Sequence, residues 1–210
     1  MLDALSELPS AGCVVLDVGC GSGEISECFA QWDCEPVLID LTDAASHRSH
    51  ERTGLPAVQG DALQLPFRDQ AFDYGISIGV LHHTTDCRAG FEELVRVTRG
   101  EVVVMVYGIV SVYRLIYRLA TPMRRWVPVE AVERLPRWLL ELARLCIRLQ
   151  GRGTVSDAQV RRSLADSLWT PHASFHTAKE LHGWAEDLGL RTAFQKWLVL
   201  HGHFMVFSRV

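Results

Sequence analysis

The feature that most constrains the fold of this chain is a glycine-rich turn between a buried strand and a helix. Residues 14–18 form an apolar run interrupted by one acid, Asp17, and lead directly into Gly19-Cys20-Gly21-Ser22-Gly23. The following stretch, residues 24–32, has the pattern of a helix. Glycines at such a junction let backbone N–H groups approach an anionic ligand at the positive end of the helix. The turn therefore predicts a strand–turn–helix unit that carries a ligand site.

Short apolar runs and helix-like stretches alternate through the first hundred residues. Strands are expected at residues 14–18, 36–40, 57–61, 72–78 and 101–107. This alternation indicates βαβ units and a mostly parallel sheet that is covered on both faces. With 210 residues, of which 48% are hydrophobic and 22% charged, the chain suits one globular domain spanning residues 1–210.

The end of the chain has a different pattern. Thr177 and Glu180 have the spacing of a capping box, which opens a helix that stops at Gly189. Residues 194–200 and 204–209 then resemble two strands joined by the turn His201-Gly202-His203, whose histidines we interpret as structural. The expected fold class is α/β: a Rossmann-like, doubly wound, mostly parallel seven-stranded sheet with an antiparallel C-terminal strand.

A helical insert is expected after the fifth strand, at about residues 109–170. It holds eleven arginines against five acidic residues, and Pro122, Pro128 and Pro136 divide it into separate helices. We expect it to be a lid over the substrate site. Its aliphatic residues, with Trp126 and Trp138, would line an apolar pocket while the arginines face water. Two alternatives stay open: extra packing on the sheet, and peripheral contact with an anionic membrane or a lipid-like substrate.

Composition excludes several classes of protein. A net charge of −4 argues against a nucleic-acid binder that works by bulk electrostatics. The six cysteines contain no Cys-x-x-Cys pair, so neither a disulfide framework nor a metal site is expected. The first ten residues carry Asp3 and Glu7 and no basic residue, unlike a signal peptide. The longest uncharged apolar run, residues 102–113, is shorter than the ~18–20 residues of a membrane span. A cytoplasmic location is therefore expected.

The glycine-rich turn by itself fits several kinds of site. A P-loop would require a lysine, which this turn lacks, and the dinucleotide fingerprint would require glycine at Glu24. A tight turn without any ligand is the remaining alternative.

Acidic residues near the ends of three successive strands decide between these alternatives. Asp17, Asp40 and Asp61 occupy these positions and converge on one crevice, the usual ligand site of an open α/β sheet. Asp17 would hold a ligand amino group, Asp40 both hydroxyls of a ribose, and Asp61 an adenine amino group.

A family resemblance agrees with this interpretation. Residues 15–23 resemble motif I of class I S-adenosylmethionine-dependent methyltransferases. The segments Gly60-Asp61-Ala62, Leu65-Pro66-Phe67, Phe72-Asp73 and Val80-Leu81-His82-His83 resemble the rest of the methyltransferase type 11 pattern. The resemblance implies S-adenosyl-L-methionine as the cofactor and no metal. The implied cofactor-binding residues, besides Asp17, are Gly19, Cys20, Gly21, Ser22, Gly23, Asp40, Leu41, Asp61, Ala62 and Ser77. One departure is Arg96-Val97-Thr98-Arg99-Gly100, where the family usually has Arg-Val-Leu-Lys-Pro-Gly-Gly.

Methyl transfer from a sulfonium needs alignment, exclusion of water and, for some acceptors, removal of a proton. His82 and His83 follow the fourth strand, where either could act as the base; the alternative is a structural role in the loop. His172 and His176 precede the last helix and are further candidates that face the substrate, or else solvated loop residues.

The motifs of the chain are compatible with three functions. The leading one is methyl transfer to an O, N or C nucleophile of a small, partly apolar metabolite in biosynthesis. The alternative is a non-catalytic accessory protein of a biosynthetic pathway that holds the cofactor or substrate. RNA methylation is disfavoured because Ser77-Ile78-Gly79-Val80 lacks an Asn/Asp-Pro-Pro-Tyr/Phe motif, so no nucleic-acid partner is expected. The substrate and the oligomeric state stay open.

Overall fold

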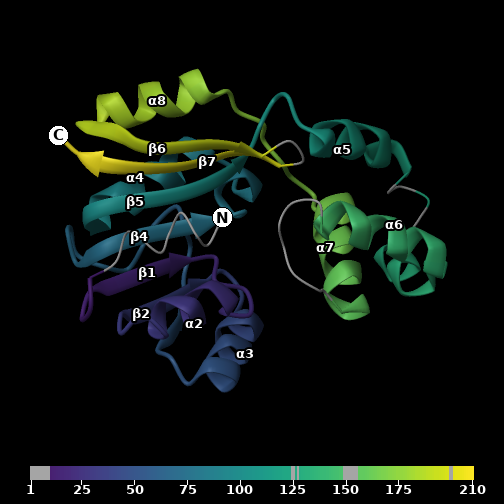
Figure 1. Cartoon of the computed structure of the whole chain (residues 1–210), viewed down its shortest axis with the longest axis horizontal. Helices are drawn as coiled ribbons and strands as arrows, with labels where there is room; N and C mark the ends of the chain where they lie inside the picture. The colour runs from purple at the N-terminus through teal and green to yellow at the C-terminus, as the bar shows by residue number, and fades with distance from the viewer. Residues whose placement is uncertain (1–9, 124–125, 127, 149–155, 199–200) are drawn as a thin grey trace.

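The computed structural model describes residues 10–123, 126, 128–148, 156–198 and 201–210; the amino-terminal segment considered for a signal peptide lies almost wholly outside them. It contains a seven-stranded sheet of order β3-β2-β1-β4-β5-β7-β6 (Figure 1). The strands are β1 Val14–Val18, β2 Glu35–Asp40, β3 Ala57–Gln59, β4 Phe72–Ile78, β5 Thr98–Tyr107, β6 Leu190–Leu198 and β7 Gly202–Arg209. The helices are α2 Glu24–Ala30, α3 Asp43–Thr53, α4 Cys87–Val97, α5 Val112–Met123, α6 Arg137–Arg148, α7 Asp157–Trp169 and α8 Ala178–Asp187, with the 3-10 turns η1 Leu81–His83 and η2 Val129–Arg134.

The expected fold class is confirmed. Strands β1 to β5 pair in parallel, and β7 runs antiparallel to both β5 and β6. Alternate residues of β1 face opposite layers, because successive side chains of a strand point to opposite sides of the sheet. Leu16 packs in the cluster that includes Phe91 of α4 and Leu181 of α8. Val15 packs with Phe29 of α2 on the other face.

Two local predictions concern the ends of elements. The capping box is present, since Thr177 Oγ1 accepts the N–H of Glu180 and the Glu180 carboxylate accepts the N–H of Thr177. Strand β5 begins at Thr98, earlier than expected, because α4 passes directly into it. Residues 96–100, which depart from the family pattern, therefore form the end of α4 and the start of β5. A side chain at Gly100 would put its Cβ 2.3 Å from the carbonyl oxygen of Asp73.

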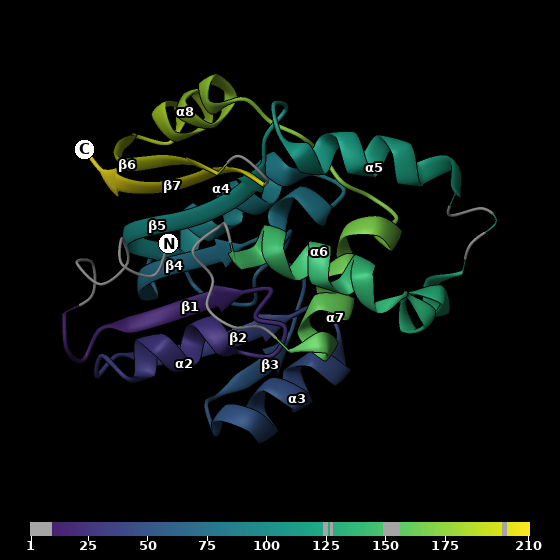
Figure 2. The same cartoon turned by 45° about the vertical axis from the view of Figure 1, so that its right-hand side comes forward.

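The expected helical insert follows β5. Both views place α5, α6 and α7 beyond the carboxyl ends of the parallel strands (Figures 1 and 2). Helix α7 packs against α5, η2 and α6, and an ion pair joins Arg144 of α6 to Asp157 of α7. Pro128 precedes η2 and Pro136 precedes α6, as expected for residues that divide the insert into separate helices. Pro122 does not separate two helices as expected, because it lies inside α5, one residue before its end.

The surface of the insert differs from the expectation. Trp126 is 83% exposed and Trp138 is 68% exposed, so these side chains do not line an enclosed pocket. The aliphatic residues of α5 are also largely exposed, whereas Tyr113 and Tyr117 contact other aromatic rings. The prediction that Trp126 and Trp138 form an apolar pocket is therefore wrong. The helical period shows which residues share a face, but it does not show which way the face turns.

The cysteines whose side chains are described, Cys13, Cys20, Cys28, Cys34 and Cys87, are free thiols. Cys13 and Cys34 are both buried, with their sulfur atoms 3.0 Å apart. Within the described part of the chain, no helix has the length and apolarity needed to cross a membrane. Across those same residues, no group of three or more His, Cys, Asp or Glu side chains is placed to hold a metal ion.

Candidate cofactor and acceptor site

A cavity of about 300 Å³ lies at the carboxyl ends of β1 and β2 and the loop after β4. The chain runs from β1 through β2 to β3 on one side and from β4 to β5 on the other, so this is the point where the strand order reverses. Ligands of open α/β sheets bind at such a point. The cavity is lined by Val18, Gly19, Ile39, Asp40, Leu41, Gly60, Asp61, Ala62, Leu63, Val80, His83, Thr84 and Thr85.

The glycine-rich loop is held against the end of β2. The N–H groups of Gly19 and Cys20 both donate to the carbonyl of Ile39, at 2.8 and 3.1 Å. Gly19 has φ +76°, and a Cβ there would lie 2.3 Å from Val80. Glycine is required at this position for both reasons, because side chains are strained at this φ and the neighbouring valine leaves no space. The first glycine of the loop therefore forms part of the cavity wall.

Asp40 connects this loop to the start of α3. Its Oδ2 accepts the backbone N–H of Gly21 at 3.0 Å, and its Oδ1 accepts the N–H and Oγ1–H of Thr42, each at 3.1 Å. A carboxylate has about four acceptor positions, so one remains for a ligand hydroxyl. Three hydrogen bonds from the protein thus orient the carboxylate in the cavity wall before any ligand binds.

The opposite wall combines one acid with apolar side chains. Asp61 is exposed, and its Oδ1 accepts the N–H of Leu63 at 2.9 Å. Ile39, Leu41 and Ala62 provide the apolar surface beside it. A flat aromatic ring with a polar edge matches this wall, since its faces need apolar contact and its amino group needs an acceptor.

Asp17 and Ser77 lie behind the cavity instead of lining it. The carboxylate of Asp17 accepts the hydroxyl of Ser26 at 2.6 Å, and burial raises its pKa to about 6. The hydroxyl of Ser77 is fully buried and donates to the carbonyl of Val18 at 3.1 Å. Both were expected to contact the ligand; the structure instead gives the side chain of Ser77 a role in joining β4 to β1.

The other residues of the glycine-rich loop, 20–23, are not part of the cavity lining. Burial raises the pKa of the Cys20 thiol to about 11, and its sulfur lies 3.6 Å from the Ser49 hydroxyl. The hydroxyl of Ser22 lies 3.4 Å from Oε1 of Glu24, and Gly23, at φ 75°, is the N-cap of α2. Of the loop residues named from the sequence, only Gly19 lines the cavity.

The four candidate catalytic histidines come together at the edge of the cavity. His82 and His83 form η1, and the segment containing His172 and His176 lies against it. The Ser174 N–H donates to the carbonyl of His82 at 2.8 Å, and the His176 N–H donates to that of Tyr107, also at 2.8 Å. Nδ1 of His83 lies 2.9 Å from the carbonyl oxygen of His172, which is 89 residues away in sequence.

His83 is the histidine that lines the cavity. A carbonyl oxygen can only accept a hydrogen bond, so the contact with His172 assigns the proton to Nδ1. The neutral ring then carries its lone pair on Nε2. His83 therefore has the orientation and location of a general base.

The other three histidines have different environments. His82 is fully buried, its ring stacks on Tyr107 with centroids 3.6 Å apart, and neither ring nitrogen has a hydrogen-bond partner among the described residues. Burial holds its pKa well below the ordinary value for histidine, so the ring is neutral. His172 is exposed and contributes its carbonyl. Nε2 of His176 contacts the Ser174 hydroxyl at 2.8 Å, and burial lowers its pKa.

Sequence reasoning missed part of the cavity lining. Val80, Thr84 and Thr85 flank the histidine pair, and Leu63 follows Ala62. Their proximity in sequence to motif residues was the available signal. Val80 is the most consequential of these residues, because it packs where a Cβ on Gly19 would lie.

Known proteins resemble this chain most clearly over the residues that form the cavity. A family model described as a methyltransferase domain matches residues 16–106. A tRNA (carboxymethyluridine(34)-5-O)-methyltransferase of Xenopus tropicalis is 37% identical over 122 residues, which are 53% of this chain and 18% of that protein. A demethylmenaquinone methyltransferase of Roseiflexus castenholzii is 39% identical over 106 residues, which are 46% of this chain and 42% of that protein. The match thus spans less than half the length of either relative.

Solved structures resemble the whole chain in fold. Magnesium protoporphyrin IX methyltransferase from Synechocystis PCC 6803, with bound SAH, has a TM-score of 0.64 at 16% identity, covering 100% of this chain and 78% of that one. The putative methyltransferase in a complex with the Haloferax volcanii Trm112 activator has a TM-score of 0.66 at 14% identity, covering 99% of this chain and 87% of that one. At these identities the likeness shows the Rossmann-like fold alone.

Proposed function

Since residues 16–106 form a methyltransferase domain of the type 11 family, we propose that this protein transfers a methyl group from S-adenosylmethionine to an O, N or C nucleophile of a small, partly apolar molecule. One observation carries the proposal. The cavity at the reversal of strand order joins Asp40, Asp61 and an apolar wall to the glycine-rich loop, with His83 at its edge.

The residues of the cavity fit the cofactor. Asp40 would accept a hydrogen bond from one ribose hydroxyl, not from both as expected from the sequence, because its other acceptor positions are filled. Asp61 would accept a hydrogen bond from the adenine amino group, and Ile39 and Leu41 would pack on the ring. Asp17, beneath the loop, would offset the charge of the cofactor's ammonium group. When bound, the cofactor supplies an electrophilic methyl group on its sulfonium. The chain then needs to bind, orient and shield the acceptor.

His83 would remove the proton from an acceptor hydroxyl or amine. Its contact with the carbonyl of His172 holds the imidazole with Nε2 as the acceptor atom. His82 would act as a positioning residue, since its neutral ring stacks on Tyr107 with centroids 3.6 Å apart and contacts the tilted ring of His83 with centroids 4.2 Å apart. In this proposal His82 has no contact with the acceptor.

The insert would cover the acceptor side of the site. The ring of Tyr113 on α5 lies 4.7 Å from that of Tyr107 at the end of β5, and Tyr117 lies 5.6 Å from Phe175. These contacts support a cover that begins at the site. Deleting residues 122–160 should then leave cofactor binding measurable while abolishing transfer, and added acceptor should slow amide exchange in the insert. If added acceptor left amide exchange in the insert unchanged and the deletion variant still transferred methyl groups, the insert would not be the cover of the site.

The proposed function is tested in two steps. Calorimetry with S-adenosylhomocysteine measures cofactor binding, and radiolabelled S-adenosylmethionine then measures transfer to phenols, carboxylic acids, amines and bulk tRNA. Saturable binding with label on a small molecule is expected. Label on tRNA would replace the proposed substrate class; this arm is included because the Xenopus tropicalis relative is named a tRNA methyltransferase. Binding without transfer to any acceptor would support the accessory role, and absence of binding would overturn the proposal.

A further inference from the structure

Helix α5 turns its aliphatic side chains outward. Leu115 is 60% exposed and Leu119 is 64% exposed, with Val112 and Ile116 partly exposed beside them. These residues are three or four positions apart, so they share one face of the helix. The ring of Tyr113 instead contacts the ring of Tyr107, with centroids 4.7 Å apart. A face that would normally pack into a core is therefore open to the surroundings.

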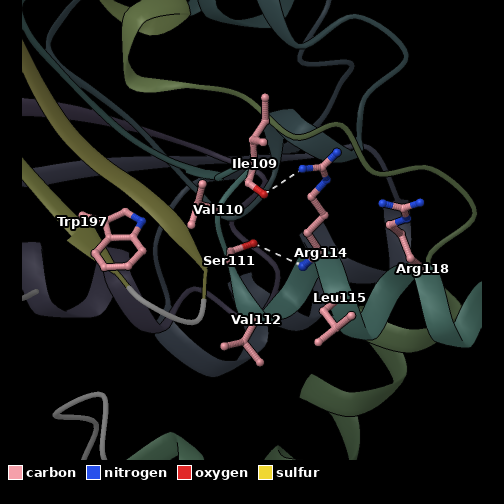
Figure 3. A pocket seen from close by; sticks show the side chains of 8 residues that line it. All are labelled: Ile109, Val110, Ser111, Val112, Arg114, Leu115, Arg118 and Trp197. Atoms are coloured by element: carbon pink, nitrogen blue, oxygen red, sulfur yellow. Dashed lines mark hydrogen bonds between the residues drawn. The ribbon is translucent and has the colours of Figure 1, made fainter.

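An open groove of about 480 Å³ continues this face onto the sheet. Its walls are Ile109, Val110, Ser111, Val112, Arg114, Leu115, Arg118 and Trp197. Figure 3 shows Trp197 of β6 on one side of the groove and α5 on the other, with Val110 and Val112 between them. Trp197 is 48% exposed and Val110 is 72% exposed. We call this groove, together with Ile116 and Leu119, the α5 face.

The charge on this face has one sign. The chain has no acidic residue from Val102 to Val129, and α5 carries Arg114 and Arg118. Figure 3 shows both guanidinium groups on the same side of the helix, away from Val112 and Leu115. Arg114 donates to the carbonyl of Ile109 at 3.0 Å, and neither arginine forms a salt bridge with a described acidic residue. Because Arg118 is three positions after Leu115, the row of unneutralised positive charge borders the exposed hydrocarbon along the helix.

We propose that the α5 face docks on the surface of an anionic phospholipid bilayer. Leu115, Leu119 and Val110 would enter the boundary between headgroups and acyl chains, and the arginines would contact lipid phosphates. Trp197 suits the same depth, because its ring is apolar and its N–H is polar. An RNA partner would gain from the arginines but not from the aliphatic side chains. A second copy would oppose arginine to arginine across a two-fold interface.

The position of the face gives docking a consequence for the site. The groove begins at Ile109, two residues after Tyr107, whose ring stacks on His82. A bilayer against the α5 face would therefore lie next to the acceptor side of the cavity. This consequence rests on the proposed function, whereas the docking itself does not.

Vesicle flotation of the 210-residue chain tests the docking without any activity assay. Vesicles of phosphatidylcholine alone are compared with vesicles containing about 30% phosphatidylglycerol, at low and physiological salt, because screening weakens attraction to a charged surface. The protein should float with the anionic vesicles, and binding should fall as salt rises. Equal binding to both kinds of vesicle, or none to either, would overturn the proposal.

Variants locate the surface. Arg118→Glu should weaken partitioning about fivefold or more, since one basic residue contributes roughly that factor at such a surface. Leu115→Ser with Leu119→Ser should weaken it at least as much. Arg48→Glu on α3 and Val58→Ser on β3 are matched exposed controls and should bind as the unchanged protein does. Far-ultraviolet circular dichroism confirms that every variant is folded. Three results would each contradict the assignment. They are controls that bind vesicles as weakly as the α5 variants do, binding of tRNA in place of vesicles, and a dimer that the Leu115→Ser substitution abolishes.

Discussion

The carboxylate of Asp40 accepts the backbone N–H of Gly21 at 3.0 Å. This hydrogen bond joins the end of β2 to the loop that follows β1, so two parts of the candidate cofactor site hold each other in place. A single side chain thereby has two tasks: it positions the loop, and it offers its remaining acceptor position to the ligand.

Asp40→Ala should weaken binding of S-adenosylhomocysteine by about 30-fold or more, because a buried hydroxyl of the ligand loses a charged acceptor and the loop loses the contact that orients it, together worth roughly 2–4 kcal/mol. Isothermal calorimetry measures the change. Asp43→Ala, which removes an exposed carboxylate in the first turn of α3, is the matched control. An unchanged affinity in Asp40→Ala would refute the assignment of the cavity.

Gly19→Ala should be more damaging than Gly21→Ala. Both glycines have positive φ, but an added Cβ at Gly19 would lie 2.3 Å from Val80, while one at Gly21 meets nothing within 4 Å. The Gly21 variant therefore carries backbone strain of about 1–2 kcal/mol, and the Gly19 variant carries a steric clash in addition. Thermal denaturation and cofactor calorimetry should both rank the variants in this order; equal loss would mean that contact with Val80 is unimportant.

Cofactor affinity should rise with pH through about 6. Burial raises the pKa of Asp17 to about 6 in the free protein, and the cofactor's ammonium group would favour the ionised carboxylate and so lower that pKa on binding. Binding then releases a proton at low pH, and affinity at pH 5 should be about tenfold weaker than at pH 7. Asp17→Asn should flatten this profile. A wild-type affinity independent of pH between 5 and 7 would show that Asp17 does not respond to the ligand.

Cys20→Ala should retain near-normal turnover. Burial raises the pKa of the thiol to about 11, so the sulfur is not a thiolate at neutral pH and is a poor nucleophile. Steady-state kinetics, once an acceptor is identified, give the comparison with the unchanged protein. Loss of all activity with cofactor binding intact would instead reveal a nucleophile.

His83→Gln should lower kcat by about 100-fold or more for a hydroxyl or amine acceptor, which is a typical contribution of a general base. Its cofactor affinity should stay within a few-fold of the unchanged protein. His172→Ala is the control, because its contact with His83 is made by the backbone carbonyl. Comparable losses in both variants would indicate that the loop as a whole matters, not the imidazole of His83.

Much of the sheet could be predicted because its signals are local. Strands β1 and β4 have the bounds expected from their apolar runs, and Thr177 caps α8 through contacts within one turn. Asp40 and Asp61 were identified because residues at the ends of neighbouring parallel strands meet at one edge of the sheet. Neither inference needs any knowledge of distant contacts.

What the sequence by itself determined is therefore the order of the elements, the location of the cavity and two of the three acids expected to face it, Asp40 and Asp61. The tertiary structure alone decided which of two adjacent histidines, His82 or His83, reaches the cavity, and that the aliphatic face of α5 turns outward. The physical reason is the range of the interactions. Periodicity and capping act between residues a few positions apart, whereas the orientation of η1 and α5 depends on Tyr107, Phe175 and His172, which approach them from distant parts of the chain.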